Sequence, residues 1–345
     1  MKKGISISLT GLILFAVLFL FAEEFASGIK TGLLNCSRVV IPSLFPFMAA
    51  ASLTGKGELP QKLKRIINPF TKFLFGLPSE CFFTVVIGQL GGYLAGAKSA
   101  DSLFESGKLT ESEASRLILF CVNAGMGFSV NAVGSAMLNS RESGRILLLS
   151  LTLSSLLTGF VSKYFSLKKT ECAHNITKKT SFSEALVGSV NSAAESTLYA
   201  CGFVTVFSGI AAVIESVIKN KTIGTAISCL LEVTNGCFAA SGKVSLPVIS
   251  AVCAFGGICV HFQIFSVAKN IKINIPLFYT FRIMHAAAAY IICKTLLHLF
   301  PIEQNVFLSI AENSALWSYS APASVSLLFL SALLILDLDN KEKVW

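Results

Sequence analysis

Residues Leu231-Glu232-Val233-Thr234-Asn235-Gly236 place an acid, a hydroxyl, an amide and a glycine inside the apolar stretch 223–241. The stretch is too short and too interrupted for a simple membrane span, which needs roughly 20 mostly apolar residues. Irregular backbone at membrane depth has to line a cavity or be buried in protein. The stretch therefore predicts an interrupted or re-entrant hairpin, and an acid at that depth is a functional-site hypothesis.

The composition of the whole chain makes a lipid bilayer the relevant solvent. Of its 345 residues, 53% are hydrophobic and only 14% are charged, whereas soluble domains carry about 25% charged residues. Disorder, a fibrous repeat or a disulfide-rich module would each need a different bias. We therefore expect an all-α polytopic membrane protein.

Apolar segments of spanning length recur along the chain. They predict about eight transmembrane helices, at 5–22, 32–53, 115–138, 146–165, 196–217, 247–268, 277–298 and 318–336. A second interrupted hairpin is expected at 73–97, where Gly88, Gly91, Gly92 and Gly96 fall within an apolar stretch. The first segment is predicted to be an uncleaved signal-anchor-like helix, because Leu20-Phe21-Ala22 before Glu23-Glu24 makes a poor cleavage site.

The distribution of Lys and Arg predicts the orientation. Loops 54–72, 163–179 and 269–276 are basic, whereas 23–31 and 299–317 carry four acids and one lysine. By the positive-inside rule, both termini lie in the cytoplasm of a protein in the cell (inner) membrane. The predicted units are an anchor helix (1–30), a first repeat (31–165), a basic linker with an interfacial helix (166–195), a second repeat (196–300), and a last span with a tail (301–345).

The two halves share one plan on either side of the basic linker. Each has a spanning helix, an interrupted hairpin with a polar tip, and a helix with a glycine-rich centre. Counting spans places the two hairpins on opposite sides of the membrane, which makes the halves inverted repeats. Paired interrupted segments in inverted repeats point to a transport site near the bilayer midplane.

Several motifs also resemble the sporulation integral membrane protein YlbJ family. They are Gly92-Tyr93-Leu94-Ala95-Gly96-Ala97-Lys98, Asn123-Ala124-Gly125, Leu231 to Gly236, Phe255-Gly256-Gly257-Ile258-Cys259-Val260-His261-Phe262-Gln263 and Arg282-Ile283-Met284-His285-Ala286. The resemblance implies a nucleoside-recognition "Gate" domain, similar in plan to concentrative nucleoside transporters. It also implies a membrane role in forming the spore cortex, and it fixes no substrate.

The candidate site consists of polar and glycine residues at the hairpin tips and helix breaks. The expected solute-binding residues are Gln89, Gly91, Gly92, Asn123, Gly125, Thr234, Asn235, Gly256, Gly257 and Gln263, and the expected residues for coupling to a proton or ion are Glu232, His261 and Glu195. The alternative is structural: amides and imidazoles can bond neighbouring helices, Glu232 can pair with Arg282, and Glu195 can be a solvated helix end.

The sequence favours a secondary-active carrier or facilitator of a small polar solute. It is not expected to be an enzyme, because no acid, base and nucleophile set stands out. No cofactor beyond a coupling proton or sodium ion, no metal site and no nucleic-acid partner is expected. Expected partners are the solute, membrane lipids, and other copies or sporulation membrane proteins. The alternative function is a scaffold that recruits cortex-building proteins.

Overall fold

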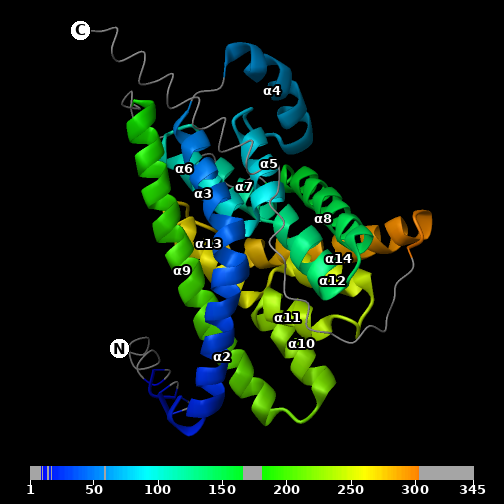
Figure 1. The fold of residues 1–345 in the computed structure, drawn as a ribbon. Helices are drawn as coiled ribbons and strands as arrows, with labels where there is room; N and C mark the ends of the chain where they lie inside the picture. The colour runs from blue at the N-terminus through cyan, green and yellow to red at the C-terminus, as the bar shows by residue number, and fades with distance from the viewer. Residues whose placement is uncertain are drawn as a thin grey trace.

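The computed structural model describes residues 9–302, with gaps at 10, 14, 17, 58–59 and 166–180, and every regular element in this part is helical (Figure 1). The first half contains α2 (Ala22–Asn35), η1 (Cys36–Val40), α3 (Ile41–Lys56), α4 (Gln61–Phe75), α5 (Cys81–Gly91), α6 (Tyr93–Glu105), α7 (Glu111–Cys121), η2 (Gly127–Met137) and α8 (Arg141–Ser162). The second half contains α9 (Phe182–Val217), α10 (Lys221–Leu231), α11 (Val233–Ala240), α12 (Leu246–Phe255), α13 (Gly257–Val267) and α14 (Ile275–Leu299).

Four helical segments of the described part are long and apolar enough to cross a membrane. They are Arg141–Ser162, Phe182–Val217, Leu246–Val267 and Ile275–Leu299, and the bent pair Gly11–Leu20 with Ala22–Arg38 makes a fifth if it is counted as one span. The all-helical class is therefore confirmed. The predicted span 318–336 and most of the basic linker lie outside the described residues.

The long helices surround a core built from short ones. Helices α2 and α3 run along α9, and α14 crosses α8 and α12 (Figure 1). Helix α6 packs against α3, α5, α7 and α13, and every residue from Tyr93 to Leu103 is buried. Helix α6 therefore lies in the interior of the fold, where protein surrounds the freed backbone groups, whereas α10 has only Gly224 and Ser228 buried.

Two segments differ from the sequence-based expectation. Residues 54–72 were expected to form a loop, but α4 covers most of them with an amphipathic helix. The stretch 181–195 was expected to be a separate interfacial helix, but it is the first part of the 36-residue α9. A capping box of Ser181 and Glu184 begins α9, and no proline follows to end it before the apolar stretch.

Candidate functional site

Four helix breaks define the centre of the molecule. Helices α5 and α6 are separated by Gly92, and α7 and η2 by residues 122–126. Helices α10 and α11 are separated by Glu232, and α12 and α13 by Gly256. Gly92 and Gly256 have φ angles of 98° and 91°, in the left-handed region that favours glycine. Each interruption falls within a stretch where the sequence predicts an interrupted hairpin or a helix with a glycine-rich centre.

Within each half, the hairpin break touches the break of the neighbouring helix. A Cβ atom on Gly125 would lie 2.7 Å from the backbone nitrogen of Gly92. In the second half, a Cβ atom on Gly257 would lie 3.2 Å from the Val233 nitrogen and 3.4 Å from the Glu232 nitrogen. Glycine at these positions thus lets backbone approach backbone.

The two halves meet through Tyr93 and Arg282. The Tyr93 hydroxyl donates a hydrogen bond to the carbonyl of Cys253, one turn before the break of α12. The fully buried Arg282 guanidinium donates to the carbonyls of Leu119 (2.5 Å) and Val122 (2.8 Å), and to that of Ala254 (3.4 Å). Arg282 therefore holds the carboxyl ends of α7 and α12, where a cation also offsets the helix dipoles.

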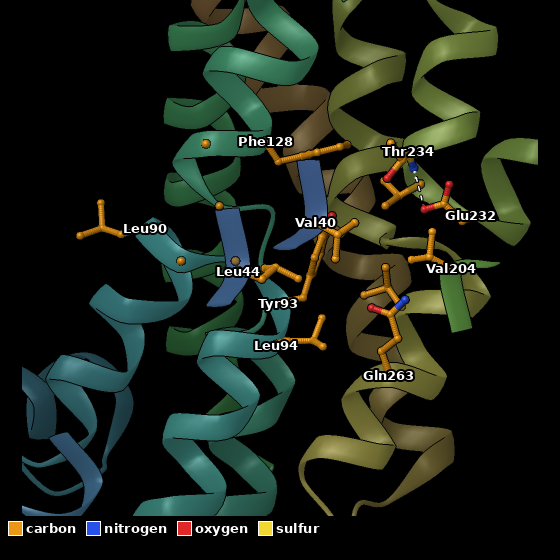
Figure 2. Close-up of a pocket in the computed structure, with 16 residues that line it drawn as sticks. Val40, Leu44, Leu90, Tyr93, Leu94, Phe128, Val204, Glu232, Thr234 and Gln263 are labelled. Atoms are coloured by element: carbon orange, nitrogen blue, oxygen red, sulfur yellow. Dashed lines mark hydrogen bonds between the residues drawn. The ribbon is translucent and has the colours of Figure 1, made fainter. Parts of the chain in front are cut away.

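A cavity of about 70 Å³ lies among these breaks, with room for on the order of five water molecules. Figure 2 shows Leu44, Tyr93 and Leu94 on one side of it and Val204, Glu232 and Gln263 on the other. The lining residues are Val40, Leu44, Leu90, Gly91, Gly92, Tyr93, Leu94, Gly125, Gly127, Phe128, Val204, Glu232, Val233, Thr234, Val260 and Gln263. Six expected site residues thus line one cavity: Gly91, Gly92, Gly125, Glu232, Thr234 and Gln263.

Glu232 is the one charged side chain among the described residues that line the cavity. Its side chain is buried, and its two carboxylate oxygens accept the backbone N–H groups of Thr234 (2.9 Å) and Asn235 (2.7 Å). Glu232 is thus the N-cap of α11, where the helix dipole favours a negative charge. The expected alternative, an ion pair with Arg282, is not found: the guanidinium bonds are to carbonyls.

The Asn235 side chain forms part of a polar link to α2 and α9. Its carbonyl oxygen accepts from the Asn35 amide at 3.1 Å, and its own amide donates to the Ser208 hydroxyl at 3.0 Å. The link fixes the α10–α11 break against the long helices.

Gln89 and Asn123 form a buried network next to the cavity. The Asn123 amide donates to Gln89 Oε1 at 2.6 Å and to the Leu151 carbonyl at 3.0 Å. Gln89 in turn donates to the Ser155 hydroxyl at 2.8 Å. This geometry matches the structural alternative, since both amides bond to α8 and neither residue lines the cavity.

The remaining candidates lie apart from the lining. His261 is buried, with Nε2 2.7 Å from the Phe255 carbonyl oxygen and its ring in edge contact with Phe255, Phe278 and Tyr279. The Glu195 side chain is 54% exposed and lies 3.9 Å from Lys269. Gly256 packs against the Tyr93 ring and Gly257 against the Glu232 break. Among the described residues no cluster of three acidic, His or Cys side chains offers a metal site.

Sequence reasoning missed the contribution of the first half's long helix. Val40 and Leu44 line the cavity, and Val40 ends the π-helical turn η1. The second π-helical segment, η2, provides Gly127 and Phe128. Such turns are frequent at functional sites. Pro42, next to η1, was a sequence signal for irregular backbone there.

Together these features define a class: an all-helical membrane protein whose interrupted helices line a small cavity with one buried acid. The chain is similar to the sporulation integral membrane protein YlbJ of Bacillus subtilis (strain 168), with 28% identity over 151 residues. The match covers 44% of this chain and 36% of that protein, so it spans about a third of the relative's length. It confirms the resemblance that the motifs indicated. No family model and no solved structure matches the chain.

Proposed function

We propose that the protein is a secondary-active carrier or facilitator of a small polar solute, and that it acts in the membrane during sporulation. The sporulation role is supported by the similarity to YlbJ, whose family implies a part in forming the spore cortex. The observation that carries the transport proposal is a cavity lined by three of the four helix breaks, at Gly92, at residues 122–126 and at Glu232, and by α13 after the fourth. The buried carboxylate of Glu232 belongs to this lining. Interrupted helices that present backbone and polar groups to a central site are characteristic of secondary transporters.

The proposed carrier consists of two inverted repeats. Apart from α4, which lies between α3 and α5 without a counterpart, both halves contain in the same order a helix, two short helices with a break between them, a broken helix and a long helix. The corresponding elements are α3 and α9, α5–α6 and α10–α11, α7–η2 and α12–α13, and α8 and α14. Alternating access would follow from one repeat moving against the other around the cavity.

Glu232 is the proposed coupling residue. Glu232 lines the cavity, and its carboxylate receives two backbone N–H bonds, which leave further lone pairs on its oxygens. A proton or a sodium ion at these oxygens would neutralise the buried charge when the solute binds or leaves. Thr234 and Gln263 then supply the uncharged polar contacts to the solute. The reaction is a translocation without chemical change.

The test is thermal unfolding of the purified protein against nucleosides, amino sugars and amino acids, with and without sodium and at several pH values. A solute at 100 times its dissociation constant should add about 2.7 kcal/mol to the free energy of unfolding. We expect one solute class to stabilise the protein, and Gln263→Ala and Glu232→Gln to weaken that response.

The matched control is Glu142→Gln, because the Glu142 side chain is 62% exposed and does not line the cavity. It should leave the solute response unchanged. If the folded wild-type protein responds to no solute, or if the cavity variants respond as it does, the carrier proposal is wrong at this site. The scaffold alternative would then be tested by capture of partner proteins.

A further inference from the structure

The short helix α4 carries an apolar stripe that stays more than half exposed, although the Phe70 ring touches Phe82 edge-on at 6.3 Å between centroids. Ile66, Phe70 and Phe73 are 72%, 52% and 70% exposed, and their spacing places them on one face of the helix. Another face, with Ile67, Thr71 and Phe75, is buried and packs against α5 and α8. With 15 residues, α4 is too short to span a bilayer.

The contact with α8 locates α4 relative to the membrane. Helix α8 is a candidate span that ends at Ser162. Directly after it, the Lys163 ammonium donates to the Phe73 carbonyl at 3.3 Å and lies 4.0 Å from the Phe160 ring centroid. The next residue, Tyr164, is 70% exposed. A lysine and an exposed tyrosine at the end of a span are typical of the membrane–water interface.

Basic side chains flank the apolar stripe at the same level. Arg65 and Lys72 are exposed and directly precede Ile66 and Phe73, so each lies about 100° around the helix from its apolar neighbour. Both line an open cleft of about 470 Å³ between α4 and the turn at Gly76–Ser79.

The acids of this cleft already have partners. Glu80 pairs with Lys64 at 2.8 Å, and Glu113 accepts the backbone N–H and hydroxyl of Thr110 at 2.9 Å. Among the described residues, no ion pair involves Arg65 or Lys72. The cleft therefore presents two unpaired positive charges beside an apolar stripe.

We propose that α4 and the end of α8 form a binding surface for an anionic phospholipid. The acyl chains would pack against Ile66, Phe70 and Phe73, and the headgroup phosphate would bind Arg65 and Lys72. This matches the amphipathic interfacial helix, in which apolar side chains enter the acyl boundary and basic ones bind anionic headgroups. The proposal goes beyond the transport function and does not depend on it.

The test measures lipid binding to the purified, detergent-solubilised full-length protein by native mass spectrometry. Phosphatidylglycerol is compared with phosphatidylcholine of the same acyl chains, and glycerol 3-phosphate serves as a source of phosphate without chains. We expect phosphatidylglycerol to bind more tightly than either, and Arg65→Gln with Lys72→Gln to weaken its binding about tenfold or more. Phe70→Ser with Phe73→Ser should also weaken it, because the chains lose their contact.

The control is Lys219→Gln with Lys221→Gln. These two exposed lysines lie at the turn between α9 and α10, at the end of the molecule opposite α4 (Figure 1). This variant should bind phosphatidylglycerol as the wild type does. The proposal is overturned if both lipids bind equally, if the Arg65 and Lys72 double variant keeps wild-type affinity, or if glycerol 3-phosphate binds as tightly as the lipid.

Discussion

The hydroxyl of Tyr93 donates a hydrogen bond to the backbone carbonyl of Cys253, and this bond joins the hairpin of the first half to the broken helix of the second. The pair is buried, and it lies beside Gly256. A Cβ atom added to Gly256 would lie 3.3 Å from the Tyr93 ring. The cavity wall is thus held by a contact between the two proposed repeats.

Replacing Tyr93 by Phe should lower the free energy of unfolding by about 1–3 kcal/mol, because a buried carbonyl loses its donor. Thermal or denaturant unfolding in detergent measures the change. The matched control is Tyr199→Phe, whose hydroxyl donates to Glu195 at the exposed surface and should contribute under about 0.5 kcal/mol. Equal effects of the two substitutions would contradict a structural link at Tyr93.

Replacing Gly125 by Ala should separate the breaks of the first half. The new Cβ would lie 2.7 Å from the Gly92 nitrogen, so the backbone must shift, at a cost of about 1–3 kcal/mol. Gly202→Ala in α9 is the control, since its Cβ meets nothing within 4 Å and alanine favours a helix over glycine. We expect Gly125→Ala to lower the free energy of unfolding and Gly202→Ala not to lower it. An unfolding midpoint as high as that of the wild type would show that the breaks do not touch.

Removal of the Arg282 guanidinium should be the most damaging of these changes. Arg282→Met leaves the carbonyls of Leu119 and Val122 without their donor, and each bond to a charged group contributes about 1.5–3 kcal/mol. Arg145→Met is the control, because the Arg145 side chain is 66% exposed. If Arg282→Met unfolds at the same temperature as Arg145→Met, the guanidinium does not hold the helix ends.

The Glu80 carboxyl should make stability depend on pH. Burial by itself raises the pKa of this group, but hydrogen bonds from Lys64, its own backbone N–H and Ser79 outweigh that and lower the pKa below 4.5. A lowered pKa stabilises the folded state above the unfolded value, and that stabilisation is lost as the pH falls through the folded pKa. Going from about pH 7 to about pH 3 should therefore destabilise the wild type more than Glu80→Gln. If wild type and Glu80→Gln lose the same free energy of unfolding between these pH values, the Glu80–Lys64 pair does not stabilise the fold.

The helix breaks could be predicted because the residues that cause them stand out in apolar stretches. Gly92, Glu232 and Gly256 are visible in the sequence without any tertiary information. Their convergence was also predicted, from the two-fold plan. The two-fold plan does not determine which side chains line the cavity. Gln89 and Thr234 were both expected to bind the solute, but of the two only Thr234 lines the cavity.

Other features depend on contacts that leave little mark on the sequence. Arg282 binds backbone carbonyls, and every residue has a backbone carbonyl. Sequence alone therefore could not distinguish these partners from an ion pair between Arg282 and Glu232. The link between Asn35 and Asn235 joins residues 200 positions apart. Helix α4 was missed for a different reason: reading 54–72 by charge alone overlooked the helical spacing of Ile66, Phe70 and Phe73.

The most direct test of the carrier function is uptake into proteoliposomes of the solute class found by thermal unfolding, with wild-type protein and Glu232→Gln side by side. We predict that wild-type protein accumulates the solute when a proton or sodium gradient is imposed, and that Glu232→Gln removes the gradient dependence. Glu142→Gln should behave as the wild type. No uptake by folded wild-type protein, or the same gradient-driven uptake by Glu232→Gln, would contradict a carrier coupled through the buried carboxylate.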